Sequence, residues 1–200
     1  MLREAKRRQT RLDLITAALR LVDERGADHV TVDEIATAAG VSQRTFFNYF
    51  ATKEDALVGD PLEGCTDLRA QLLAAPADQQ LLDALFDALA PVFQQIQQDR
   101  EHWLLRMRVI GNNPQLLPLL IAAAATAEQQ FAEAVAERAG LAAGDPFPQV
   151  AAAVTNAAVR VAVIRWAAGE DARPLSEHVR EAFGTIAAGL VPPPPVSRNA

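Results

Sequence analysis

"TVDEIATAAGVSQRTFFNYFATKEDAL", residues 31–57, is the stretch of sequence that decides the fold. Thr31 is followed three residues later by Glu34, and Thr52 is followed three residues later by Asp55. Each pair matches the capping box, in which a hydroxyl and a carboxylate satisfy the free backbone N–H groups at a helix start. The stretch therefore predicts that one short helix begins after Thr31 and another after Thr52.

A third short helix is expected between these two. The segment "AAGVS" at residues 38–42 supplies Gly40, which can take the positive φ of a sharp turn, and then Ser42, a residue type that caps helices. Ala36 is small at the place where two helices must cross closely. A short helix, a tight turn containing glycine and a second short helix form the helix-turn-helix pattern.

Four aromatic residues fall within five positions of the second helix of this motif. Phe46 and Phe50 are four residues apart, so they share one helix face and are expected in the core. Phe47 and Tyr49 lie on opposite flanks of that face, at the edges of a polar outer surface. The first turn carries three side chains suited to base edges and methyl groups, namely Gln43, Arg44 and Thr45.

Residues 12–57 resemble the DNA-binding domain of the TetR family of bacterial transcriptional regulators, most clearly in the run "AALRLVDERGADHVTVDEIATAAGVSQRTFFNYFATKEDAL". The family often has Tyr where this chain has Phe47, so a hydroxyl contact is lost there. Arg44 either reads a guanine or holds a phosphate. The resemblance implies base or groove contacts for Gln43, Arg44, Thr45 and Phe47, and phosphate contacts for Thr31, Tyr49 and Lys53.

The rest of the sequence predicts helices only. An amphipathic helix from Leu12 ends at Gly26, and further helices are expected near residues 66–75, 79–98, 100–111, 115–139, 148–168 and 175–190. We therefore expect an all-α fold of about nine helices. Its domains would be a three-helix helix-turn-helix domain with a basic arm at residues 1–55, a helical ligand-binding and dimerisation domain at 56–191, and a disordered Pro-rich tail at 192–200.

The charge distribution points to a local anionic partner. The net charge is −6, yet residues 1–55 hold nine basic and nine acidic side chains, and their first twelve positions are strongly basic. A basic N-terminal arm on an acidic protein suits DNA, although a solvated chain end gives the same pattern. The single cysteine, Cys65, fits a reducing cytoplasm. No membrane partner is expected, because the longest apolar helix carries Asn156, Arg160 and Arg165.

The TetR resemblance implies that the C-terminal part holds the dimer interface. Two apolar stripes are predicted to form the interface of a homodimer that reads palindromic operator DNA. The alternative is that these stripes close the core of the single chain. On the last helix the stripe is Leu175, Val179, Phe183, Ile186 and Leu190, and on the preceding helix it is Val150, Val154, Ala158 and Val161.

The same resemblance implies a small-molecule effector. The segment "REHWLLRMRVIGNNPQL", residues 100–116, resembles a branch of the family associated with acyl-CoA-like ligands. An apolar cavity beside Arg106 or Arg108 would suit a chain with an anionic head group, and arginines on a solvated face are equally consistent. The candidate ligand contacts, each also consistent with plain core, are Phe93, Trp103, Met107, Phe131 and Trp166.

Nothing in the sequence indicates an enzyme, a metal site or a cofactor. His29, His102 and His178 are scattered without zinc-ligand spacing, and there is no Gly-rich phosphate loop. The expected function is a ligand-responsive regulator, most simply a repressor that binds a palindromic operator as a homodimer. The alternative is a helical ligand-binding or adaptor protein whose helix-turn-helix no longer binds DNA.

Overall fold

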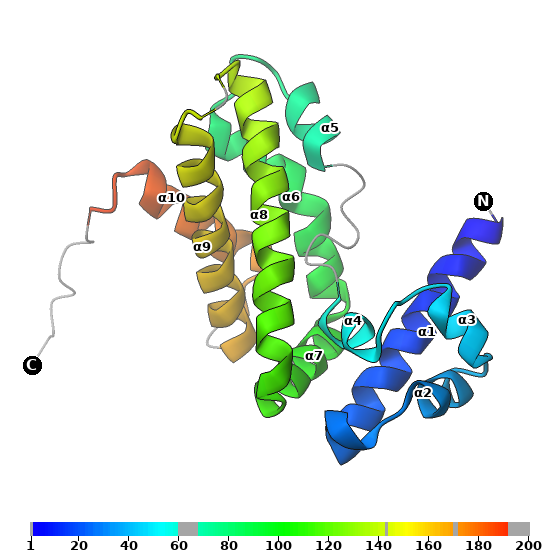
Figure 1. Cartoon of the computed structure of the whole chain (residues 1–200). Coiled ribbons are helices and arrows are strands. Elements are labelled where there is room, and N and C mark those ends of the chain that lie inside the picture. The colour runs from blue at the N-terminus through cyan, green and yellow to red at the C-terminus, as the bar shows by residue number, and fades with distance from the viewer. Residues whose placement is uncertain (1, 60–67, 143, 170–171, 192–200) are drawn as a thin grey trace, which may run out of the picture. The chain divides into compact units, whose positions relative to one another are not determined.

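The computed structural model describes residues 2–59, 68–142, 144–169 and 172–191, and within these ranges it contains helices and no strand (Figure 1). The predicted all-α fold is confirmed, with ten α-helices rather than about nine. They are α1 (Leu2–Arg25), α2 (Val32–Ala38), α3 (Gln43–Phe47), α4 (Lys53–Val58), α5 (Leu68–Ala74), α6 (Leu81–Gln98), α7 (Arg100–Asn112), α8 (Leu117–Ala139), α9 (Phe147–Ala168) and α10 (Leu175–Ala187), with short 3-10 turns η1 (Ala27–His29) and η2 (Pro114–Leu116).

The chain forms two compact units, and the first of them is discontinuous in sequence. It combines residues 1–63 with residues 98–127, and the second unit comprises residues 64–97 and 128–200. The expected domain boundary at residue 55 differs from this division, because the end of α4 and the C-terminal half of α7, with Val109 and Ile110, contribute to the core of the first unit. The expected Pro-rich tail at residues 192–200 lies outside the described residues.

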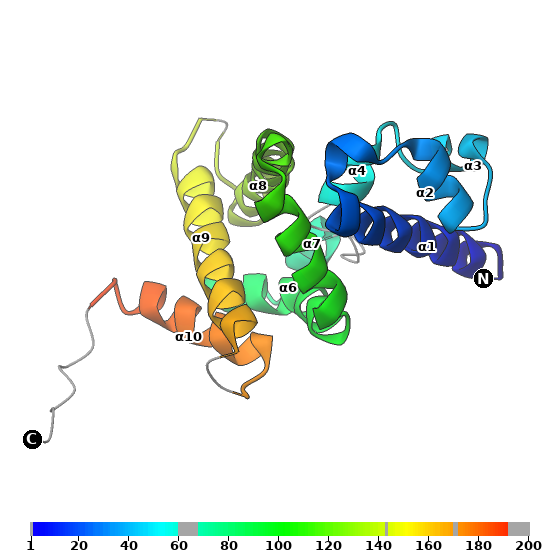
Figure 2. The same cartoon turned by 90° about the horizontal axis from the view of Figure 1, so that it is seen from below.

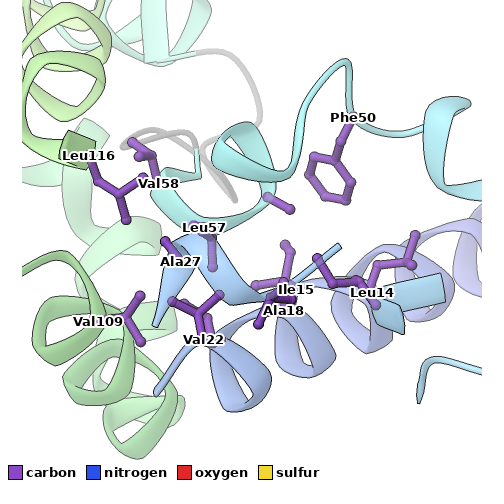
Figure 3. Close-up of a cluster of buried hydrophobic side chains, with 14 of the residues drawn as sticks. Leu14, Ile15, Ala18, Val22, Ala27, Phe50, Leu57, Val58, Val109 and Leu116 are labelled. Atoms are coloured by element: carbon purple, nitrogen blue, oxygen red, sulfur yellow. The ribbon is translucent and has the colours of Figure 1, made fainter. Parts of the chain in front are cut away.

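One apolar cluster holds the first unit together (Figure 3). Leu14, Ile15 and Val22 of α1 belong to this cluster together with Leu57 of α4 and Val109 of α7, and all five are buried. Burying a side chain of this size stabilises a fold by about 1.5–3 kcal/mol. Since α7 supplies part of this apolar surface, α1 to α4 do not close their core alone.

The first helix starts earlier than the sequence predicted, at Leu2 instead of near Leu12. Its N-terminal half contains no glycine or proline, and two local contacts support it: Gln9 donates to Asp13 and the Thr10 hydroxyl donates to the Lys6 carbonyl. The predicted basic arm is therefore the N-terminal part of α1. The periodicity from Leu12 marked only the part of the helix that packs on the core.

The second unit is built from α5, α6, the C-terminal half of α8, and the packed pair α9 and α10. Phe86 of α6 contacts Phe93 on the same helix at a ring-centroid distance of 5.9 Å and Phe183 of α10 at 6.2 Å. Leu175 and Val179 of α10 are fully buried within this chain. The predicted interface stripe on the last helix is therefore wrong for these residues, because that face closes the core of the second unit.

The helix α9 has two apolar faces, and only one is covered within the chain. Ala158, which the sequence placed in the interface stripe, is buried at 8% exposure, so that assignment is also wrong. The opposite face leaves Val150, Val161 and Ile164 exposed at 58%, 48% and 57%. Together with the half-exposed Phe147 they form an apolar seam on one side of the helix, made of two pairs that are each three residues apart, Phe147 with Val150 and Val161 with Ile164.

Among the described helices, α9 alone is long and apolar enough to cross a membrane by length and composition. Its contacts are those of a helix packed in a protein. Arg165 of α9 forms an ion pair of 3.0 Å with Glu181 of α10, and Asn156 donates to Glu128 of α8 at 3.0 Å. These polar contacts with α8 and α10 agree with the prediction that this helix is a core or interface helix.

Candidate DNA-binding surface and effector-site residues

The two helices of the helix-turn-helix are started by the predicted caps. Thr31 accepts from the Glu34 backbone N–H at 3.3 Å, and the Glu34 carboxylate accepts from the Thr31 backbone N–H at 2.9 Å. Ser42 accepts from the backbone N–H of Thr45 at 3.1 Å. Between the helices, Gly40 has φ of +70°, which glycine adopts without strain. The predicted turn is thus confirmed residue by residue.

The carboxylate of Glu34 is tuned by its position in the cap. The backbone N–H of Thr31, then the Thr31 hydroxyl, and finally the Arg25 guanidinium at 2.8 Å lower the pKa of the Glu34 carboxyl below its usual range. The ionised carboxylate also lies in the first turn of α2, where the helix dipole favours negative charge. The charged form of Glu34 therefore supports the start of the first helix in the motif.

The helix α3 is anchored by the aromatic residues that the wheel placed on its inner face. Phe46 is fully buried, and its ring lies 5.5 Å from the ring of Phe50 and 5.6 Å from that of Phe47. The guanidinium of Arg11 lies 4.8 Å from the centre of the Phe50 ring, which attaches α1 to the end of the motif. These contacts fix a helix of five residues that is too short to be stable alone.

The outer face of α3 is exposed and polar. Gln43 and Arg44 are exposed, and within the described part of the chain neither side chain has a hydrogen-bond or ionic partner. Phe47 presents its ring to solvent with 52% of the residue exposed. Thr45 is partly buried, and its hydroxyl shares a 2.9 Å hydrogen bond with Ser42. Figure 2 shows α3 at the rim of the three-helix group formed with α1 and α2.

The predicted phosphate contacts occupy different environments. Thr31 is exposed, although its hydroxyl is engaged with Glu34, and Tyr49 is partly buried against the core cluster. Lys53 differs from both, because its ammonium donates to the carbonyls of Ala27 at 2.6 Å and Val30 at 3.0 Å. Lys53 thus ties the start of α4 to the segment before α2, a role that the sequence did not indicate. Its phosphate contact stays a prediction.

The predicted effector contacts are distributed over both units. Phe93, Phe131 and Trp166 are buried on α6, α8 and α9 of the second unit. Trp103 and Met107 are partly buried on α7 of the first unit, where Met107 packs against the core cluster. Their role in ligand binding stays a prediction.

The two arginines considered for a ligand head group separate clearly. Arg108 is exposed and forms a two-pronged ion pair with Asp23, at 2.8 and 2.7 Å, which lowers the pKa of the Asp23 carboxyl. Arg106, two residues earlier on α7, is partly buried, and its Nε is buried without a hydrogen-bond partner among the described residues. The alternative of a solvated face therefore fits Arg108 and not Arg106.

Sequence reasoning missed one buried polar residue that joins the segments of the first unit. Asn113 accepts from the backbone N–H of Ala27 at 2.9 Å and donates to the carbonyl of Val109 at 2.7 Å. In the sequence, Asn112, Asn113 and Pro114 indicated only a helix break. The hydrogen bond to Ala27 could not be predicted from the local sequence, because Ala27 lies 86 residues away along the chain.

A capped helix-turn-helix with an exposed polar second helix defines a DNA-binding regulator of the helix-turn-helix class, and the comparisons with known proteins name the family. The model described as "Bacterial regulatory proteins, tetR family" matches residues 14–58, and the model described as "MftR C-terminal domain" matches residues 79–191. The chain belongs to the TetR family of bacterial transcriptional regulators.

Two curated relatives show the same membership. The "HTH-type transcriptional regulator TcmR" of Streptomyces glaucescens is 32% identical over 173 residues, which cover 82% of this chain and 76% of TcmR. The "Putative mycofactocin biosynthesis transcriptional regulator MftR" of Mycobacterium tuberculosis is 32% identical over 189 residues, which cover 94% of this chain and 95% of MftR.

A solved structure confirms the fold. Thermus thermophilus FadR, described as a TetR family transcriptional repressor in complex with lauroyl-CoA, has a TM-score of 0.56 and 21% sequence identity to this chain. The match covers 95% of this chain and 100% of that chain. At this identity the likeness concerns the fold.

Proposed function

We propose that this protein is a cytoplasmic, ligand-responsive repressor that binds a palindromic operator as a homodimer. The observation that carries the proposal is the outer face of α3, where Gln43 and Arg44 are exposed beside the exposed ring of Phe47 and have no partner among the described residues. Side chains with these groups recognise base edges and thymine methyl groups in the major groove. A helix-turn-helix that had become an adaptor would have no need to keep this polar surface unpaired.

The homodimer is supported by the uncovered face of α9. Phe147, Val150, Val161 and Ile164 are exposed on one side of α9, a helix that also packs on α10. An exposed apolar side of a long helix suits a second helix of the same kind, and a twofold dimer presents two recognition helices to two half-sites.

The effector proposal is an apolar or amphipathic small molecule. It is supported by the match to the MftR C-terminal model and by the lauroyl-CoA complex of the structural neighbour FadR. The chain offers two tryptophans as probes, Trp103 and Trp166. Variants Trp103→Phe and Trp166→Phe each leave one indole, so a titration with lauroyl-CoA followed by fluorescence tests both residues. A saturable change that vanishes in one variant assigns the contact to the replaced tryptophan.

The experiment that tests the function is selection of DNA from a random pool, followed by a mobility-shift assay on the selected sequence. We expect a palindromic consensus and its release by the effector. Arg44→Ala should relax the preference at one base pair by about 1–3 kcal/mol if the guanidinium contacts guanine. An unchanged consensus with weaker binding would assign Arg44 to a phosphate, and the absence of any enriched sequence would favour the adaptor alternative.

A further inference from the structure

The end of α4 and the middle of α7 enclose Arg106, whose charge has no partner among the residues that the structure describes. The guanidinium of Arg106 lies directly against Gly59, the residue that ends α4. A methyl group at Gly59 would come within 2.5 Å of Nη1 and 2.8 Å of Cζ of Arg106. Gly59 also has φ of +73°, a backbone conformation that favours glycine, and the short distances show that the guanidinium packs directly on it.

A second unpaired polar group stands one helical turn away. His102 and Arg106 are four residues apart on α7, and residues at this spacing lie on the same helix face. His102 Nε2 and Arg106 Nε are both buried and have no hydrogen-bond partner among the described residues. A buried polar atom without a hydrogen-bond partner lowers the stability of the fold, and a ligand that bonds to it would remove that cost.

The charges around this pair favour an anion. Burial, and then the charge of Arg11, lower the pKa of Arg106 to about 10, so the guanidinium is still charged at neutral pH. Burial and then the charge of Arg106 lower the pKa of His102. Among the smaller effects, the charge of Asp99 raises this pKa and the charge of Arg20 lowers it. The site therefore combines one fixed positive charge with a neutral imidazole able to donate one hydrogen bond.

We propose that Arg106 and His102 bind a small oxyanion, the carboxylate or phosphate group of a small molecule, at the C-terminal end of α4. A guanidinium offers paired N–H donors that match the oxygens of either group, and its charge strengthens the bonds. Arg108 provides the internal contrast, because the same side chain two residues further along already has a carboxylate in Asp23. The inference rests on the proposed function in one respect, namely that the oxyanion is a group carried by the effector.

An anion in this place contacts the first unit at a position connected to the DNA-binding motif. Arg106 belongs to α7, and Gly59 ends the helix whose first residue, Lys53, bonds to the carbonyls of Ala27 and Val30 before α2. A ligand that bridges α7 and the end of α4 will therefore stabilise the first unit, by an amount that grows with ligand concentration relative to its Kd.

The test is anion binding by the full-length protein, measured by calorimetry and thermal unfolding at constant ionic strength. The probes are inorganic phosphate, acetate and decanoate. We expect saturable binding of at least one probe, at least tenfold weaker in Arg106→Met and within about twofold of the wild type in Arg108→Met. Phosphate alone would identify a phosphate group, and decanoate with or without acetate would identify a carboxylate.

Three results would overturn the site: no saturable binding of any probe, equal binding in Arg106→Met, or equal loss in Arg108→Met.

Two control measurements separate the site from other roles. In buffer without these probes, Arg106→Met should unfold at the same or a higher temperature than the wild type, because it removes an unpaired buried charge. A large decrease would make Arg106 a structural residue and would overturn the proposal. Arg106→Met should also bind the selected operator as the wild type does, so that failure of the anion site and failure of DNA binding are distinguishable.

Discussion

Lys53 shows how one side chain can serve a role that its sequence motif does not announce. The TetR resemblance assigned it to a phosphate, and in the structure its ammonium bonds to the carbonyls of Ala27 and Val30. An ammonium has three donors, so two internal acceptors leave one proton for an external oxygen. Both roles are therefore chemically compatible, and an experiment can separate them.

Replacing Lys53 by Ala should lower the free energy of unfolding by about 1–3 kcal/mol, because two carbonyls lose their donor. If Lys53 also contacts a phosphate, the slope of log affinity against log salt should become shallower by about one. Chemical denaturation and salt-dependent mobility shifts measure the two effects. A lower stability with an unchanged salt slope would show that Lys53 serves the fold alone.

Asn113 carries a second prediction at this scale. Asn113→Ala leaves the Ala27 N–H and the Val109 carbonyl without their partner in a buried place, so it should destabilise the protein by about 2 kcal/mol or more. The exposed neighbour Asn112 offers the matched control, and Asn112→Ala should change stability by less than about 0.5 kcal/mol. Equal effects in denaturant unfolding would contradict the assigned role.

At the scale of the element, the sequence predicted what depends on near neighbours. The caps at Thr31, Ser42 and Thr52 were all identified correctly, since each involves groups within three residues along the chain. The true start of α1 was missed because its first turns are exposed and carry no apolar period. The buried face of α10 was assigned to a partner subunit because an apolar stripe does not reveal what covers it.

The capping box of α2 gives a prediction about pH. The folded protein lowers the pKa of Glu34, so this carboxylate stabilises the fold above its ordinary value of 4.5 and stops doing so as the pH falls through the lowered value. Glu34→Gln should therefore be less stable than the wild type at pH 7, and the difference should shrink as the pH falls below 4.5 and vanish once the pH lies below the lowered pKa of Glu34. Thermal unfolding of both proteins across this range measures it. A constant difference down to pH 3 would mean that the charge is unimportant.

At the scale of the whole molecule, the seam on α9 predicts the oligomeric state. Ile164→Glu places a carboxylate in the middle of an apolar contact, where an unpaired charge costs several kcal/mol, so the protein should become monomeric and lose operator binding. Gln149→Glu, on an exposed flank of the same helix, should remain dimeric. Sedimentation velocity and circular dichroism measure assembly and folding. A folded dimer of Ile164→Glu that still binds DNA would place the interface elsewhere.

The sequence predicted the exposure of the candidate DNA-binding residues more completely than the surroundings of the candidate ligand contacts. Gln43, Arg44 and Phe47 are exposed as expected, because a helical wheel decides their direction once Phe46 is buried. The candidate ligand contacts are predicted from residue type alone, and the sequence does not distinguish a Phe or Trp in a core from one that lines a pocket. Arg106 became informative only when its surroundings were known, since its sequence context also fitted the exposed Arg108.

The discontinuous first unit has a consequence for recombination between regulators. A gene fusion joined just after α4 would carry the match to the tetR family model at residues 14–58 but would leave behind Val109, Ile110 and Leu116, which complete its apolar cluster. A transplanted DNA-binding module must therefore bring residues 98–127, or matching residues of the recipient must already fit. Grafts that transfer both segments are expected in the soluble fraction of a cell extract, and grafts of the first segment alone in the insoluble fraction. Which DNA specificity such a chimera inherits is thus constrained by α7, a helix that begins at Arg100, well after the end of α4 at Val58.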